Sequence, residues 1–146
     1  MTEIHFHFNV PDRLAYACRL LRKALKRGSS GVAVCGPPTT LTRLDRTLWT
    51  FDPQEFIPHL MLRAGETPPP RLRRTPIWLV EDAQQGGHHP VLVHLGEEPV
   101  AGFESFSRLI EIVSTDDEGR DAARRRWKHY AGRGYAIEKY DVAGSA

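Results

Sequence analysis

Near the start of the chain, the spacing between apolar residues changes from every second position to every third or fourth position. Residues 4–9 read IHFHFN, with an apolar side chain at every second position, which is typical of a half-buried strand. In residues 12–27 the apolar side chains recur every three or four positions, which predicts an amphipathic helix. Lys26 and Arg27 suit the negative end of a helix dipole, and Gly28 predicts the stop.

The same alternation of strand and helix continues after this opening. Residues 31–35 form a short apolar run that predicts a second strand, and a Gly-Pro-Pro break follows it. Leucines three and four positions apart then predict a second helix, which begins at Thr39 or Thr40. This order of elements favours an α/β fold, with a parallel or mixed sheet and helices packed against it.

The second half of the chain combines proline-rich loops with short strands and one charged helix. Prolines predict irregular structure over residues 51–58 and an exposed loop over residues 63–76. Further strands are predicted at residues 77–80, 91–95, 108–113 and 135–142. Three consecutive acids at positions 116–118 favour the start of a helix that ends at Gly132 or Gly134.

Length and composition are those of one globular domain spanning residues 1–146. Apolar residues make up 40% of the chain and charged residues 26%, and the net charge is +2. These values exclude a disordered chain and are too mild to indicate nucleic-acid binding. No apolar run approaches the roughly 20 residues that cross a bilayer, and the N-terminus lacks signal-peptide features. Cys18 and Cys35 are expected to be buried free thiols, so we expect a cytoplasmic protein.

The sequence contains no recognisable catalytic or nucleotide-binding motif. The loop at residues 36–40 reads GPPTT, which lacks both GxGxxG and GxxxxGK(S/T). Its prolines also remove amide donors that a phosphate group needs. There is no GxSxG sequence, and neither cysteine lies in a nucleophile motif. We therefore predict a protein with no catalytic residue and no cofactor.

Five of the seven histidines fall into two groups, which raises the question of a metal site. The groups are His5 with His7, and His88 and His89 with His94. A zinc site usually has three or four ligands at matched spacing, often with Cys or carboxylate, and neither group has that pattern. We predict no metal site, with His5 and His7 facing solvent and His88 and His89 in a turn.

The most unusual feature is the basic C-terminal helix, which contains the sequence RDAARRRWK. Five cations stand there against one acid. Arg120, Arg124 and Lys128 are each four residues apart, so they form a row along one side of the helix. Arg125 and Arg126 are expected to point elsewhere.

A stripe of apolar residues is expected beside this row. Its members on a helical wheel are Ala123, Trp127, Tyr130 and Ala131. A ligand that fits both features carries a carboxylate next to a hydrophobic side chain, because arginine grips a carboxylate with two parallel hydrogen bonds. The alternative interpretation is a solvated basic helix face, and the pattern alone leaves both open.

A second candidate surface lies in a segment rich in large aromatic residues. Trp49, Phe51 and Phe56 fall within eight positions, partly in a proline-bounded loop. Aromatic residues on a rigid loop are typical of protein-binding hot spots. They are equally typical of a core, so this pattern also leaves two interpretations.

Four segments, spread over nearly the whole chain, carry a resemblance to a known family. They are LDRTLWTFDPQEFIPH (44–59), AGE (64–66), PVLVHLGEEP with FSRLIEIV (90–99 and 106–113) and ARRRWKHYAGRGYAIEKYD (123–141). On these segments the sequence resembles the chi subunits of bacterial DNA polymerase III holoenzyme. Two features depart from the family: the loop Thr67–Arg74 matches no family segment, and Trp127 stands where the family often has Tyr.

The resemblance implies an accessory, non-polymerising subunit with a single three-layer, Rossmann-like α/β domain and no nucleotide site. Such subunits link the clamp loader to single-stranded-DNA-binding protein (SSB) by gripping its acidic C-terminal tail, which ends in Asp-Ile-Pro-Phe or a similar sequence. By this resemblance the cationic contacts are Arg120, Arg124 and Lys128, and the apolar neighbours are Val113, Trp127 and Tyr130.

The resemblance also implies a second protein partner. The segment with Trp49, Phe51 and Phe56 corresponds to the surface that the family uses for the psi subunit, which bridges chi to the clamp loader, and in some cases for a repair helicase. DNA is then contacted only through SSB, and no membrane is involved.

Two other functions stay open on the sequence alone. The basic helix and the arginine-rich loop could bind single-stranded nucleic acid directly, although the aromatic residues of that helix are expected on its buried side. A nucleotide-dependent enzyme is the third possibility, and the missing phosphate loop disfavours it.

Overall fold

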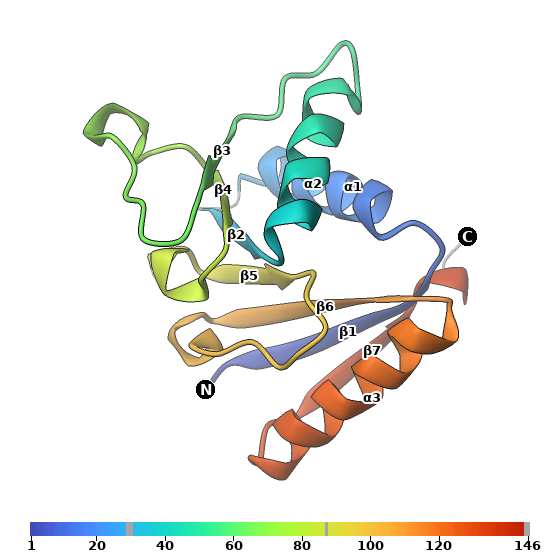
Figure 1. Ribbon diagram of the computed structural model, residues 1–146. Coiled ribbons are helices and arrows are strands. Elements are labelled where there is room, and N and C mark those ends of the chain that lie inside the picture. The colour runs from blue at the N-terminus through green and yellow to red at the C-terminus, as the bar shows by residue number, and fades with distance from the viewer. Residues whose placement is uncertain (29–30, 87, 145–146) are drawn as a thin grey trace.

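The structure is a computed structural model that describes residues 1–28, 31–86 and 88–144 (Figure 1). The strands are β1 (Glu3–Val10), β2 (Val32–Cys35), β3 (His59–Leu62), β4 (Ile77–Val80), β5 (Val91–His94), β6 (Arg108–Ser114) and β7 (Ile137–Asp141). The α-helices are α1 (Arg13–Lys26), α2 (Pro38–Thr50) and α3 (Asp117–Gly132). In this part of the chain, no helix combines the length and the hydropathy that crossing a membrane requires.

These strands form one sheet in the order β3-β4-β2-β5-β6-β1-β7. Every neighbouring pair of strands is parallel. The predicted α/β class is therefore confirmed, and the sheet is parallel rather than mixed. Parallel sheets are covered on both faces, which explains why the central strands appear in the sequence as short, continuously apolar runs.

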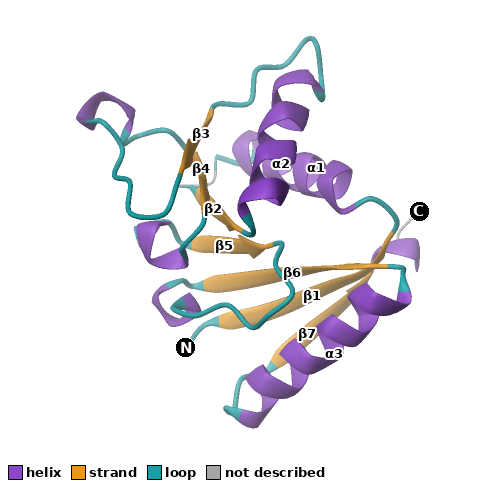
Figure 2. Cartoon of the chain, in the orientation of Figure 1, coloured by secondary structure: helices purple, strands orange, loops and turns teal. Residues whose placement is uncertain are grey.

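The helices lie on both faces of the sheet and produce three layers (Figures 1 and 2). Helices α1 and α2 cover one face, where Val34 of β2 belongs to the same apolar core as Leu21 of α1. Helix α3 and short three-ten segments cover the other face, where Ala33 of β2 joins the core around Phe103. Successive residues of β2 thus enter two different cores, as the period of a strand requires.

Most predicted elements are confirmed to within a few residues, but β3 was not predicted. It has four residues, follows directly on the proline-rich segment and lies at the edge of the sheet. Three of its four side chains are not fully buried, because an edge strand has a neighbour on one side only. The loop over residues 63–76 is largely exposed, as predicted, and contains one short three-ten turn at Pro70–Leu72.

The two cysteines are buried free thiols, as predicted. Burial raises the pKa of both Cys18 and Cys35 to about 11. Neither side chain is therefore a thiolate near neutral pH, which is the form that a nucleophilic cysteine needs.

The prediction that His5 faces solvent is wrong. His5 is only 7% exposed, and the centroid of its ring lies 5.3 Å from that of Tyr140 on β7. Strand β7 pairs with β1 at the sheet edge, so its side chains cover a face of β1 that sequence periodicity alone left open. His7 is partly buried and hydrogen-bonds the hydroxyl of Tyr16.

His89 is also more buried than a turn residue, since it is 4% exposed and its ring lies 4.7 Å from the ring of Trp78. Burial lowers the pKa of His89 to about 4 from an ordinary value of 6.5. The neighbouring His88 is exposed in a turn, as predicted.

This burial predicts a loss of stability as the pH falls. The unfolded chain binds a proton at His89 below about pH 6.5, whereas the folded protein does not until about pH 4, so protons favour unfolding in that window. Over that window we expect protonation of His89 to lower the free energy of unfolding by about 1–3 kcal/mol. Urea unfolding of the His89→Gln variant should show a smaller pH dependence than the wild type above pH 4.5. An unchanged slope would contradict the prediction.

Candidate functional site

A groove runs along α3, where this helix packs over β1, β6 and β7. It has a volume of about 660 Å³. Its lining residues are Phe6, Phe8, Asn9, Val113, Ser114, Arg120, Ala123, Arg124, Trp127, Lys128 and Lys139. Five of the six residues predicted for tail binding thus line one groove, and four further contributors come from β1 and β7.

The groove is bordered by cations. The row formed by Arg120, Arg124 and Lys128 extends along α3, and Lys139 of β7 adds a fourth cation, 5.7 Å from the ring of Trp127. None of the described lining residues is acidic. Arg124 forms an ion pair with Asp121 at 2.7 Å, but both side chains are mostly exposed. Exposed pairs of this kind contribute little, so the guanidinium stays available to a ligand.

The floor of the groove is apolar. Phe6 and Trp127 meet edge to face with ring centroids 5.1 Å apart. Trp127 is partly buried, so an aromatic surface remains open to a partner. Val113 and Phe8 continue this floor along the strands. An apolar floor beside a row of cations fits a ligand that carries an acid and a hydrophobic side chain together.

One end of the groove is shaped by an unusual backbone conformation at Asn9. Among the described residues it alone is a non-glycine with positive φ, at 62°, and the β1–β6 register shifts between His7 and Val10. The Asn9 amide donates a hydrogen bond to Asp141 at 3.0 Å and accepts one from Arg120 at 3.3 Å. Asn9 thereby ties β1 to both β7 and the first cation of the row.

Two positions on α3 test the stripe predicted from the helical wheel. Ala131, expected in the stripe, is exposed, so that prediction is wrong. Tyr130 is 0% exposed, as the wheel predicted, but it lies beneath the groove, whereas the resemblance implied an apolar neighbour that lines it. Its hydroxyl donates to Glu111 at 2.6 Å and accepts from the backbone N–H of Val100 at 3.2 Å.

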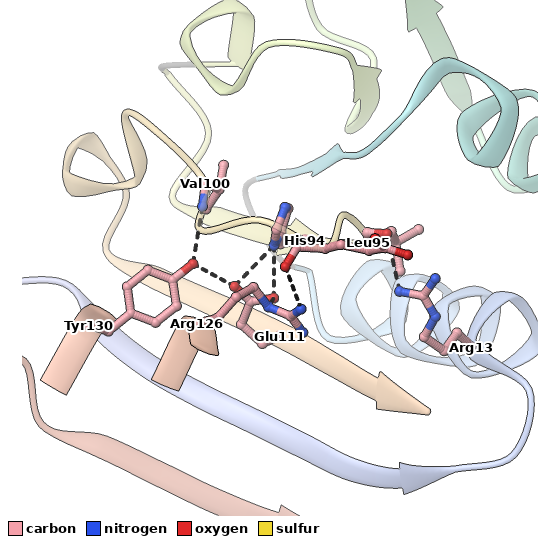
Figure 3. A network of polar contacts seen from close by, with 8 residues as sticks. Arg13, His94, Leu95, Val100, Glu111, Arg126 and Tyr130 are labelled. Carbon is pink, nitrogen blue, oxygen red and sulfur yellow. Dashed lines mark hydrogen bonds and ion pairs between the residues drawn. The ribbon is translucent and has the colours of Figure 1, made fainter. Parts of the chain in front are cut away.

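Arg126, expected to point away from the apolar stripe, belongs to a buried polar network centred on Glu111 (Figure 3). The guanidinium is 3% exposed and donates to Glu111 at 3.0 Å and to the carbonyl of Glu97 at 3.0 Å. Nδ1 of His94 lies 2.8 Å from the same carboxylate. Helix α3 is thus attached to β5 and β6 through charged groups as well as apolar packing.

Glu111 keeps its charge in this network. Burial alone would raise the pKa of its carboxyl, but the charges and hydrogen bonds of His94, Arg126 and Tyr130 outweigh burial and lower the pKa below its ordinary value. Burial and the adjacent carboxylate raise the pKa of Tyr130, so its hydroxyl stays protonated and donates. The network is therefore a satisfied ion cluster.

The second predicted surface divides in two. Trp49 and Phe56 are 55% and 69% exposed, and their ring centroids lie 5.5 Å apart. The ring of His59 also contacts the indole of Trp49, with ring centroids 4.8 Å apart. Phe51 instead is partly buried against the α1–α2 core, with the guanidinium of Arg22 at 5.3 Å from its ring. Trp49 and Phe56 alone form an exposed aromatic pair.

Two acidic residues cap the helices at the usual nucleotide position of an open parallel sheet. α1 follows β1 on one face and α3 follows β6 on the other, which makes the adjacent carboxyl ends of β1 and β6 the switch point of the sheet. Asp12 caps α1 by accepting from Ala15 at 3.1 Å, and Asp116 caps α3 by accepting from Gly119 at 3.0 Å. Carboxylates at both helix starts disfavour a phosphate there.

Comparison with known proteins agrees with this architecture. Residues 1–138 match the family described as DNA polymerase III chi subunit, HolC. The DNA polymerase III subunit chi of Pseudomonas aeruginosa is 29% identical over 145 residues, covering 96% of each chain. The Haemophilus influenzae subunit is 28% identical, covering 86% of this chain and 85% of its own, and the Escherichia coli subunit is 23% identical, covering 82% and 79%. The chain therefore belongs to the family of DNA polymerase III chi subunits.

Proposed function

We propose that this chain is a non-catalytic adaptor that captures the acidic C-terminal tail of SSB in the groove along α3. The observation that carries the proposal is the pairing of a cationic border with an open apolar floor in one groove. Arg120, Arg124 and Lys128 receive the carboxylates of the tail, and the surface around Val113 and Trp127 receives its terminal phenyl ring. Tyr130 supports this floor from beneath through its packing against Phe6.

The distribution of charge supports a peptide chain end as the ligand. A chain that ends in Asp-Ile-Pro-Phe presents a terminal carboxylate beside an aromatic side chain, with further acids upstream. Charge-assisted hydrogen bonds to such carboxylates are worth about 1.5–3 kcal/mol each. The phenyl ring gains from burial against Phe6 and Trp127 and from edge-to-face contacts. The four cations of the border then receive the acids on both sides of the ring.

Calorimetric titration with a peptide copying the host SSB tail tests this function. We expect a dissociation constant in the micromolar range, which corresponds to a binding free energy of about −8 kcal/mol. Amidation of the terminal carboxylate, or removal of the terminal Phe, should abolish measurable binding. Tight binding of the amidated peptide would contradict a carboxylate-gripping groove.

The exposed pair Trp49 and Phe56 supports the second half of the adaptor function. In this proposal it docks the psi subunit, where the host makes one, and so connects SSB to the clamp loader in the cytoplasm; a repair helicase is a competing occupant. Large exposed aromatics on a supported surface suit a protein interface. Trp49→Ala should lose binding to psi or the helicase while tail binding is retained.

Direct binding of single-stranded nucleic acid by α3 is the alternative function. Its aromatic residue in the groove, Trp127, is partly buried against Phe6 and lies beneath Lys139, so it offers a slot more than an open platform for stacked bases. Oligonucleotide affinity that depends on Arg124 and Lys128, without affinity for the tail peptide, would favour this alternative.

A further inference from the structure

The charge of this chain is strongly segregated in space. Helix α1 and its C-terminal cap Arg27 contain six cationic residues and no acidic one. The rest of the chain holds fourteen Lys and Arg against eighteen Asp and Glu, so it is acidic as a whole. Helix α1 also lies on the sheet face opposite to α3 (Figure 1), which separates its charges from the groove described above.

Only part of this cationic helix is neutralised by neighbours. Arg22 forms an ion pair with Asp52 at 3.4 Å and Lys26 with Glu55 at 3.0 Å, both in the segment that follows α2. Arg19, Lys23 and Arg27 are exposed and form no ion pair with any described residue. A protein surface that leaves three adjacent cations unpaired suits a partner with repeated negative charges.

These three cations form a straight row. They are spaced four residues apart, so they follow one side of the helix and extend over about 12 Å of its axis. Phosphates of one strand lie about 3.4 Å apart along a duplex axis and farther apart in an extended single strand, so the row can contact a run of about three phosphates.

An apolar groove lies immediately beside the row. It has a volume of about 190 Å³. Leu20 and Ala24 of α1 line it together with Val91 and Ile110 of the sheet, and Lys23 and Arg27 form its border. Leu20 and Ala24 are partly exposed. A single strand, whose bases are unpaired, can lay a base over such a surface while its phosphates contact the cations. A duplex keeps its bases paired in its interior and cannot.

We propose that the outer face of α1 binds the backbone of single-stranded DNA through Arg19, Lys23 and Arg27, without reading its sequence. The site is distinct from the tail groove, because the two helices cover opposite faces of the sheet. The contacts are to phosphates, so base composition should matter little. Such a surface lets one chain hold an SSB tail on α3 and contact the exposed strand with α1.

Fluorescence anisotropy with labelled oligo(dT) of about 15 nucleotides tests this inference. We expect weak binding by the full chain in the absence of SSB, with an affinity about 20-fold lower at about 200 mM than at about 50 mM salt, since three phosphates are neutralised. The triple variant Arg19→Glu, Lys23→Glu, Arg27→Glu should lose at least about tenfold in affinity at the lower salt.

A matched control carries the same change in net charge elsewhere. Arg71→Glu, Arg73→Glu, Arg74→Glu reverses three exposed arginines of the loop over residues 63–76 and should keep oligo(dT) binding within about threefold, the size of a net-charge effect alone. Equal losses in both triple variants, the absence of oligo(dT) binding, or equal or tighter binding of duplex DNA or of polyglutamate would each overturn the inference. The α1 variant should still bind the SSB tail peptide like wild type, which verifies its fold; a failure of tail binding in the wild type concerns the other site only.

Discussion

Replacing Glu111 with alanine should destabilise the protein by about 3–5 kcal/mol, the largest effect that we expect from one substitution. The carboxylate is 0% exposed and accepts from Arg126, His94 and Tyr130. Its removal leaves the Arg126 guanidinium buried without a counter-ion and the Tyr130 hydroxyl without its acceptor. Urea unfolding followed by circular dichroism measures this loss directly.

Two comparisons make this test specific to the buried charge. Glu98→Ala removes an exposed glutamate near the same region and should change stability by less than about 0.5 kcal/mol. The double variant Glu111→Leu, Arg126→Met replaces both charges by apolar groups and should recover much of the loss, because a well-packed apolar pair often matches a buried ion pair. A cost below about 1 kcal/mol for Glu111→Ala would show that the network does not anchor α3.

Arg124→Ala should weaken binding of the SSB tail peptide by about 10- to 150-fold, or about 1.5–3 kcal/mol. Arg124 is the middle cation of the row and lies between Arg120 and Lys128 on the border of the groove. Its ion pair with Asp121 is exposed, so the side chain can turn to a ligand at little cost. Calorimetry gives the change in affinity directly.

Arg125→Ala is the matched control for this prediction. Arg125 neighbours Arg124 in sequence, carries the same charge and is exposed, but it does not line the groove. We expect its removal to change affinity by less than about threefold, through long-range electrostatics alone. Equal losses for the two variants would indicate attraction by overall charge and not a shaped site.

The α/β class was predictable because each central strand is buried on both faces and therefore appears as a short apolar run between helical periods. The strand His59–Leu62 was not predictable in the same way. Three of its four residues are apolar, but the run is short and directly follows a proline-rich segment, which favours irregular structure. The parallel direction of every pair depends on crossover connections, which local periodicity does not specify.

The buried network shows where residue type misleads the interpretation of a helical wheel. Arg126 is four residues from Tyr130 and therefore lies on the same side of the helix, but its charge suggests the solvent side, whereas the structure buries it against Glu111. One signal was available: Glu111 stands between Ile110 and Ile112 in a strand that is apolar on both sides. A carboxylate in that position needs a buried cation, but its identity depends on the packing of α3.

The candidate groove was half predictable. The cationic row on α3 follows from four-residue spacing, which is local information. The rest of the groove, with Phe6 and Phe8 in its floor and Lys139 on its border, depends on the pairing of β1 with β7, two strands from opposite ends of the chain. Alternation along β7 puts Lys139 on the same face as the partly buried Ile137, and that pattern is visible in the sequence once the pairing is known.

Chemical-shift mapping of the isotope-labelled protein during titration with the SSB tail peptide tests the central claim most directly. We predict saturable shift changes concentrated on residues 120–128 of α3 and on Phe6, Phe8 and Val113, with α1 and the Trp49–Phe56 surface unchanged. Shift changes confined to the opposite face of the sheet, around α1 and α2, would contradict it.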